Sequence, residues 1–153
     1  MVIAVALACV LAVQADAPPE LHLMCSGSGR QGVDRNVTAY SHDNYGNTAT
    51  TTATESRTVG FDDEVRVDIT GETGRVRIPQ TMLPPLRGGD EGWFNLRKIE
   101  ATAEEITAVA TINLINKIKL RLDRVTGRLS FTTLRGSFAG RCQRIDPAAG
   151  RAF

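Results

Sequence analysis

Histidines are scarce in this sequence, and their spacing does not indicate a catalytic centre. The chain has only two, His22 and His42. Neither has a second histidine nearby, so a catalytic zinc would need acidic ligands assembled from distant segments. A hydrolytic triad would pair one of them with a serine, but the sequence has no G-x-S-x-G elbow. We expect His22 on the surface of the first strand and His42 in a polar loop.

Two other motifs have the letters of a chemical site without its context. Residues 27–32 spell G-x-G-x-x-G, but a dinucleotide site needs a helix after the third glycine, and residues 33–54 are polar and non-helical. We expect a flexible turn at this motif. Alternation along a strand would put Asp62 and Glu64 on one face beside Arg66, which can neutralise them. We expect that face to be solvated, and we predict no catalytic residues, no cofactor and no metal.

A basic strand face is the one positive indication of a binding site. Lys117, Lys119 and Arg121 alternate with apolar residues, so they project from the same side of a strand. Such a face suits an anionic lipid headgroup, a polyanionic envelope glycan or an acidic partner. The alternative is a solvated outer face that complements an acidic neighbour. No aromatic residues are interleaved with these cations, so the pattern does not indicate base stacking with nucleic acid.

The N-terminal residues predict export. Residues 2–13 are apolar and uncharged, and the run is too short for a bilayer span, which needs about 20 residues. Val13-Gln14-Ala15 fits a signal-peptidase site, so residues 1–15 are predicted to be a signal peptide and residues 16–153 the mature domain. The run lacks the basic residues that usually precede a signal core. We expect an exported protein, periplasmic in a Gram-negative bacterium, without a transmembrane span.

Cysteine usage agrees with an oxidising compartment. Cleavage after Ala15 would remove Cys9 and leave Cys25 and Cys142. One disulfide between these two is the simplest expectation, joining the first and last elements of the domain. Two buried thiols or a metal pair are the alternatives, although a structural zinc needs four ligands.

Period-two alternation is the recurring pattern of the middle and C-terminal parts of the chain. Residues 61–70, 75–78, 117–123 and 128–133 each alternate apolar with polar side chains, and turn-forming residues separate them. Residues 104–114 fit either a helix or a strand, and their β-branched residues favour a strand. We predict an all-β antiparallel meander of about eight strands that closes into a small barrel or a curled sheet.

Two long segments interrupt the alternation. Residues 31–56 are polar and include the Thr/Ala tract 48–54, so we expect an exposed loop or a weak edge strand. Residues 79–92 are rich in Pro and Gly but also carry Met82, Leu83 and Leu86. We expect this segment to be a lid held near Trp93 that either covers one end of the core or faces a partner.

Charge is divided unevenly along the chain. The formal net charge is +1, but residues 16–92 have seven arginines, no lysine and twelve acidic residues, whereas residues 93–153 have eleven basic and five acidic residues. This distribution does not indicate a uniformly basic nucleic-acid-binding protein.

Several segments resemble a group of small exported alphaproteobacterial proteins of unknown function. They are residues 74–79 (GRVRIP), 82–85 (MLPP), 88–94 (GGDEGWF), 123–127 (DRVTG) and 136–142 (GSFAGRC). The resemblance implies a Gram-negative periplasmic setting and brings no activity and no site residues.

Three classes of function follow from these observations. The first is a non-catalytic binding or envelope-associated module that takes an apolar or anionic ligand. The second is a protein-interaction module, such as a periplasmic protease inhibitor or an assembly factor. The third is a hydrolase with an unrecognised site, which the lack of a clustered nucleophile and base disfavours.

Overall fold

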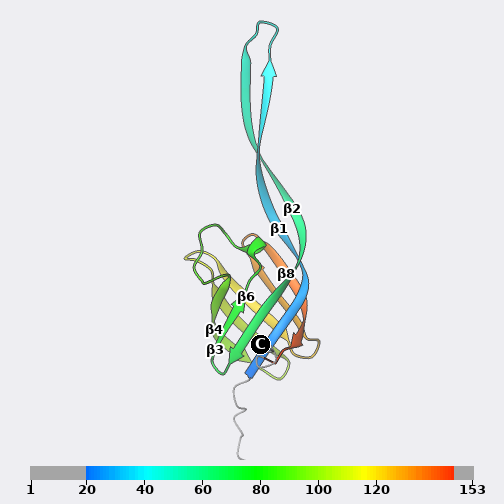
Figure 1. Ribbon diagram of the computed structural model, residues 1–153, viewed down its shortest axis with the longest axis vertical. Coiled ribbons are helices and arrows are strands. Elements are labelled where there is room, and N and C mark those ends of the chain that lie inside the picture. The colour runs from blue at the N-terminus through cyan, green and yellow to red at the C-terminus, as the bar shows by residue number, and fades with distance from the viewer. Residues whose placement is uncertain (1–19, 147–153) are drawn as a thin grey trace, which may run out of the picture.

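The computed structural model describes residues 20–146, which form eight β-strands and one short 3₁₀ helix (Figure 1). The predicted signal segment and Cys9 lie outside the described residues. The elements are β1 (Glu20–His42), β2 (Thr48–Thr70), β3 (Thr73–Arg77), η1 (Gln80–Met82), β4 (Trp93–Ala101), β5 (Glu105–Thr111), β6 (Lys117–Asp123), β7 (Arg128–Thr133) and β8 (Gly136–Arg144).

The strands form a closed antiparallel barrel. Each strand pairs with the next in the sequence, and β8 pairs with β1. The predicted all-β meander of eight strands is therefore confirmed, and the ambiguous segment at 104–114 contains strand β5. Within residues 20–146, no helix has the length and hydrophobicity that a membrane-crossing helix requires.

Apolar side chains from all eight strands fill the barrel interior. Eight strands enclose a space that side chains alone can fill. The core combines aliphatic residues with the phenylalanines of β4, β7 and β8, and Val65, Val67 and Ile69 of β2 have no exposed surface. The rings of Phe131 and Phe138 stack at 5.4 Å between centroids. The alternation seen in the sequence therefore reports the two faces of the barrel wall.

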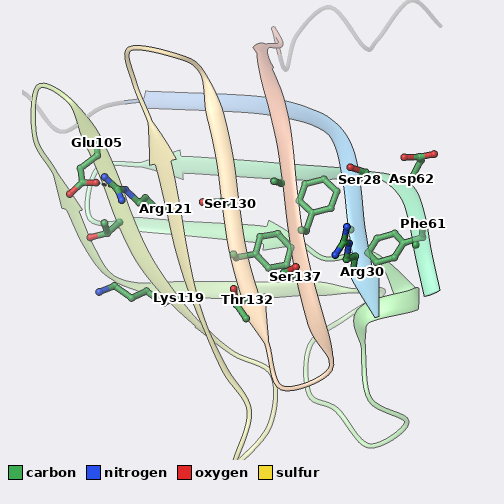
Figure 2. A pocket seen from close by; sticks show the side chains of 16 residues that line it. Ser28, Arg30, Phe61, Asp62, Glu105, Lys119, Arg121, Ser130, Thr132 and Ser137 are labelled. Atoms are coloured by element: carbon green, nitrogen blue, oxygen red, sulfur yellow. Dashed lines mark ion pairs between the residues drawn. The ribbon is translucent and has the colours of Figure 1, made fainter. Parts of the chain in front are cut away.

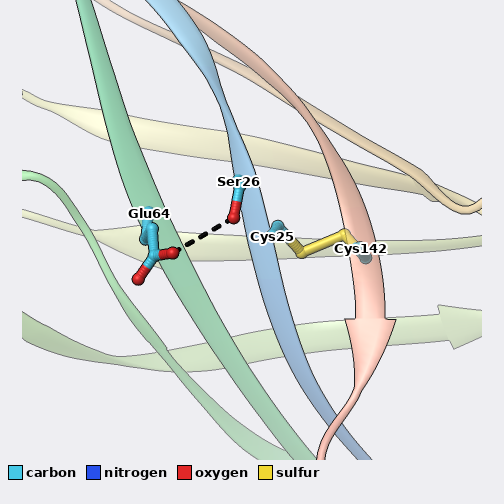
Figure 3. Close-up of a disulfide and its surroundings, with 4 residues drawn as sticks. All are labelled: Cys25, Ser26, Glu64 and Cys142. Carbon is cyan, nitrogen blue, oxygen red and sulfur yellow. Dashed lines mark hydrogen bonds between the residues drawn. A yellow bond between two sulfur atoms is a disulfide. The ribbon is translucent and has the colours of Figure 1, made fainter.

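A disulfide and a set of glycines close the barrel at the β1–β8 seam. Cys25 and Cys142 are register partners on these strands and form the predicted disulfide, 117 residues apart in sequence (Figure 3). Gly27 and Gly140 are register partners two positions further along. A Cβ atom on Gly27 would collide with the main chain of Ala139, so only glycine permits this approach of the strands.

The glycine motif at residues 27–32 is therefore not the flexible turn that its composition suggested. It lies inside the continuous strand β1, and its glycines serve the seam. Of the two expectations for residues 31–56, the loop is wrong and the exposed strand is correct, because most of these residues belong to β1 and β2. These two strands continue past the barrel as a long twisted hairpin that projects from one end (Figure 1).

Candidate functional site: the projecting ribbon and the groove at its base

The most distinctive feature of the molecule is the two-stranded ribbon, which we define as residues 32–59. β1 and β2 pair without a register shift from Glu20–Thr70 to His42–Thr48. Pairing of β1 with β8 ends at Gln31, and pairing of β2 with β3 begins only at Arg66. The ribbon has no third strand, and nearly all of its side chains are exposed. It is thus a surface that the barrel itself does not use.

A tight turn at residues 43–47 fixes the tip of the ribbon. Asp43 Oδ1 accepts hydrogen bonds from the backbone N–H groups of Tyr45 (2.9 Å) and Asn47 (2.8 Å), and Asp43 Oδ2 accepts one from Asn47 Nδ2 (2.8 Å). The hydrogen bonds from Asn47 and Tyr45 hold the pKa of Asp43 below its usual value. Gly46 has a φ of 82°, which glycine adopts without strain. The tip is therefore a hydrogen-bonded turn with a defined conformation and not an open loop.

Polar cross-strand pairs take the place of a hydrophobic core in the ribbon. Thr54 donates to Asn36 Oδ1 at 3.2 Å, and Ser56 donates to Asp34 Oδ1 at 2.6 Å. Such pairs add only tenths of a kcal/mol up to about 1 kcal/mol each. A two-stranded hairpin is marginal on its own in water, so the barrel must hold the base of the ribbon and set its register.

The outer edges of the ribbon carry unpaired main-chain groups. The N–H of Gly32 donates to the carbonyl of Arg135, in the turn before β8, and the carbonyl of His22 accepts from the N–H of Ile145, just after β8. Even-numbered residues of β1 therefore direct their main-chain groups toward β8 and away from β2. The constant register gives the same parity on β2. In the ribbon, the outward-directed groups of β2 therefore belong to Thr48, Thr50, Thr52, Thr54 and the even-numbered residues that follow. Within residues 20–146 they pair with no other strand.

A groove of about 1050 Å³ crosses the outer barrel face at the base of the ribbon (Figure 2). Its lining includes small side chains from three adjacent strands, namely Ser130 and Thr132 of β7, Ser137 and Ala139 of β8, and Ser28 of β1. Strand register places Lys119, Thr132, Ser137 and Arg30 in one row across β6, β7, β8 and β1. Cations therefore stand on both sides of a lining rich in hydroxyl groups.

The basic residues singled out in the sequence lie on this outer face, in unequal environments. Lys117, Lys119 and Arg121 are all exposed on β6, and Lys119 and Arg121 line the groove. Arg121 Nε forms an ion pair with Glu105 Oε2 at 2.6 Å, from the neighbouring strand β5. Among the described residues, neither lysine has an acidic partner within 4.0 Å. The three side chains lie on one face of β6, as the alternation predicted. The ion pair with Glu105 makes Arg121 the least available of them for a ligand.

The lid residues separate into core and surface. Met82 and Leu83 are 1% and 6% exposed and belong to the core, whereas Leu86 is 84% exposed. Asn113 Nδ2 donates to the carbonyl of Leu86 at 3.1 Å, which joins the lid to the β5–β6 turn. Trp93 is half-buried at the start of β4, and the guanidinium of Arg75 lies 4.4 Å from its ring centroid. The segment at 79–92 thus covers the core and also leaves an apolar side chain in solvent.

Asp68 is a buried carboxylate with three basic side chains around it. Alternation placed it on the wet face, yet it is only 8% exposed. Its carboxylate contacts His22 Nδ1 at 3.0 Å, Arg75 Nε at 3.1 Å and Arg66 Nε at 3.7 Å. Burial opposes ionisation, but the hydrogen bonds from His22 and Arg75 hold the pKa of Asp68 below its usual value.

His22 forms a histidine–carboxylate pair without a nucleophile. The hydrogen bond with Asp68 raises the pKa of His22, and burial partly opposes this. Its other nitrogen, Nε2, lies 3.5 Å from Glu20 Oε1, where a triad would place a serine or cysteine. His22 is half-buried, so its expected surface position is only partly correct. The cluster acts as a charge network between β1, β2 and β3.

Comparisons with known proteins give no further assignment. Searches against protein-family models, curated proteins and solved structures found no match. Within residues 20–146, no group of three or more His, Cys, Asp or Glu side chains is arranged to hold a metal ion. The resemblance to exported alphaproteobacterial proteins therefore stays a prediction.

Proposed function

We propose that the chain is a non-catalytic, exported interaction module that binds a protein partner by strand addition to its projecting ribbon. The observation that carries this proposal is the pair of open ribbon edges outside the closed barrel. An exposed strand edge offers main-chain donors and acceptors to an added strand. The barrel then serves as a rigid base that holds the ribbon out into solvent.

The structure favours this class over a carrier of apolar ligands. Interior positions are occupied by core side chains of the barrel, including Met82 and Leu83 of the lid. A partner that binds the ribbon needs no interior space. The exported, periplasmic setting of the proposal depends on the N-terminal sequence, the resemblance and the disulfide.

A shortened ribbon tests the proposal. Deleting residues 34–41 and 49–56 removes an equal, even number of residues from each strand, so Val33–Arg57 and His42–Thr48 become consecutive pairs. No core residue is lost, so the variant is expected to fold with little change in melting temperature. Photo-crosslinking from Thr52 in the envelope of the native host should yield a defined protein adduct, and binding of that protein should fail with the shortened chain.

Crosslinking from Val125 is the matched control. Val125 is 79% exposed and lies in the β6–β7 turn of the barrel, away from the ribbon. The same adduct from Val125, or undiminished binding by the shortened variant, would refute the proposal. A variant with Lys119 and Arg121 changed to Ser keeps the ribbon and should bind as the parent does.

The groove supports a second candidate function, which is binding of an extended anionic polymer. Lys119 and Arg30 lie three strands apart in one register row, or about 14 Å at the usual strand spacing. Lys119→Ala should weaken retention on an immobilised sulfated polysaccharide, whereas Lys98→Ala, at the β4 bulge, should not. Equal effects of the two changes would indicate only a general charge effect.

A further inference from the structure

The β2 edge of the ribbon lacks the features that usually protect an exposed strand. Residues 48–54 contain only Thr and Ala, with no charge, proline or glycine. The ladder they form with β1 has no bulge. Natural edges are usually guarded by charges, prolines, bulges or a covering element. Threonine also has a high strand propensity, so this edge is suited to accept another strand.

The same edge is complementary to itself. If two β2 strands pair antiparallel about a twofold axis at Thr51, Thr50 faces Thr52 and Thr48 faces Thr54 of the other copy. These even-numbered residues are the ones whose main-chain groups point outward, so they form the hydrogen-bonded pairs. An edge that satisfies its own donors and acceptors in this way needs no other protein.

Charges beyond the tract disfavour several other registers of this pairing. With the axis at Thr51, Glu55 faces Asn47 of the other copy, so no like charges meet. An axis at Glu55 or Arg57 would place identical charges opposite each other, which destabilises a strand pair. On the β1 edge, residues 36–42, which pair with the tract, are also free of charged residues, proline and glycine, but they include Val37, Tyr40 and His42 and not only Thr and Ala.

The length of the ribbon also agrees with an axis at Thr51. This residue lies midway between Asp43, where the tip turn begins, and Val59, whose β1 partner Gln31 is the last residue of β1 that pairs with β8. Two ribbons would then overlap along their full length, with the barrels at opposite ends. The register brings Tyr45, which is 92% exposed, level with Arg57 of the other copy, where an arginine–aromatic contact is available.

We propose that two copies of this chain associate through their ribbons, with the β2 edges paired antiparallel about a twofold axis at Thr51. This inference rests on the proposed strand-addition function and names its partner as a second copy. The resulting four-stranded sheet satisfies the outward main-chain groups of both Thr/Ala tracts. The β1 edges stay free at its two sides.

Cysteine trapping in the purified mature protein tests the axis. Thr51 faces its own copy in a non-hydrogen-bonded pair, where Cα atoms lie about 4.5 Å apart, within the range that a disulfide bridges. Thr51→Cys should therefore oxidise to a covalent dimer. Ala39 is the register partner of Thr51 on β1, so Ala39→Cys is the control at the same height on the other edge. Trapping through Ala39→Cys alone would overturn the proposal.

Proline substitutions test the hydrogen bonds. Thr52 and Thr38 are register partners whose N–H groups both point outward, on opposite edges. Thr52→Pro removes one intermolecular donor from each copy, and loss of two such bonds should raise the dimer dissociation constant in sedimentation experiments by about tenfold or more. Thr38→Pro should leave it unchanged. A parent protein that is monomeric across the concentration range, with no trapping through Thr51→Cys, would refute dimerisation.

The outcome separates the two proposals. A monomeric protein that still gives a Thr52 adduct with a different protein in the host would refute self-association and leave strand addition intact. The absence of both results would refute both proposals.

Discussion

The lid provides the sharpest test of how this small barrel is stabilised, through Leu83→Ala. Leu83 is 6% exposed and belongs to the core, although it lies outside every strand. Truncation of a buried leucine costs about 2–5 kcal/mol, and a position at the end of the barrel should fall near the lower end of that range. At about 3–4 °C per kcal/mol for a domain of this size, the melting temperature should fall by about 6–10 °C.

Leu86→Ala is the matched control for that experiment. The two leucines lie in the same segment, but Leu86 is 84% exposed and should tolerate the change with a shift of less than about 2 °C. Thermal unfolding followed by circular dichroism measures both variants. Equal shifts for the two would refute the assignment of Leu83 to the core. An unchanged melting temperature for Leu83→Ala would mean that the lid does not contribute to stability.

Three further predictions concern the seam and the charge network. Replacing both Cys25 and Cys142 with alanine should lower the free energy of unfolding, measured with denaturant, by about 4–5 kcal/mol through the lost loop-closure entropy. A loss below about 1 kcal/mol would contradict this prediction. His22 has a raised pKa in the fold, so its stabilisation is complete below the unfolded pKa of about 6.5 and is lost as pH rises through the folded value. Unfolding at pH 5.5 and pH 8.5 should show this fall, and His22→Gln should abolish it; a fall that persists must come from another group. Gly27→Ala should lower the free energy of unfolding by about 1–3 kcal/mol because the added Cβ meets the β8 backbone. Gly60→Ala is the control and should be near neutral, since the atom nearest to its added Cβ is 3.9 Å away. Equal melting temperatures for the two variants would argue against close packing at the seam.

The barrel was predictable because each strand of its wall has one buried and one solvent-exposed face, which gives a period-two alternation in the sequence. Residues 118–122 of β6 alternate in the sequence and in the structure alike, and residues 65–69 of β2 do so except at Asp68, which is buried. The disulfide followed from the cysteine count, and it correctly placed the first and last strands together. The choice of a strand at 105–111 followed from its β-branched residues.

The ribbon was not predictable by the same rule because both of its faces are wet. Without a buried face there is no alternation, so residues 31–56 looked like a loop. A local signal was nevertheless present: Asp43 and Gly46 form a turn, with the β-branched tract 48–54 following it. Asp68 was misplaced for another reason. His22 of β1 and Arg75 of β3 cover it together with Arg66 of its own strand, and alternation within one strand cannot show the contacts from the neighbouring strands.

The continuity of β1 from the seam to the tip gives the molecule a mechanical property. The strand has 23 residues, or about 75 Å at the usual rise, and the disulfide fixes it to β8 near its base. Tension applied to the tip along β1 is borne in shear by the ladders with β2 and β8 and is then transferred through a covalent bond to the far end of the chain. With the disulfide formed, β1 and β8 are therefore joined covalently as well as by their ladder, and reduction of that bond would leave only the hydrogen bonds between the two strands to resist the same pull.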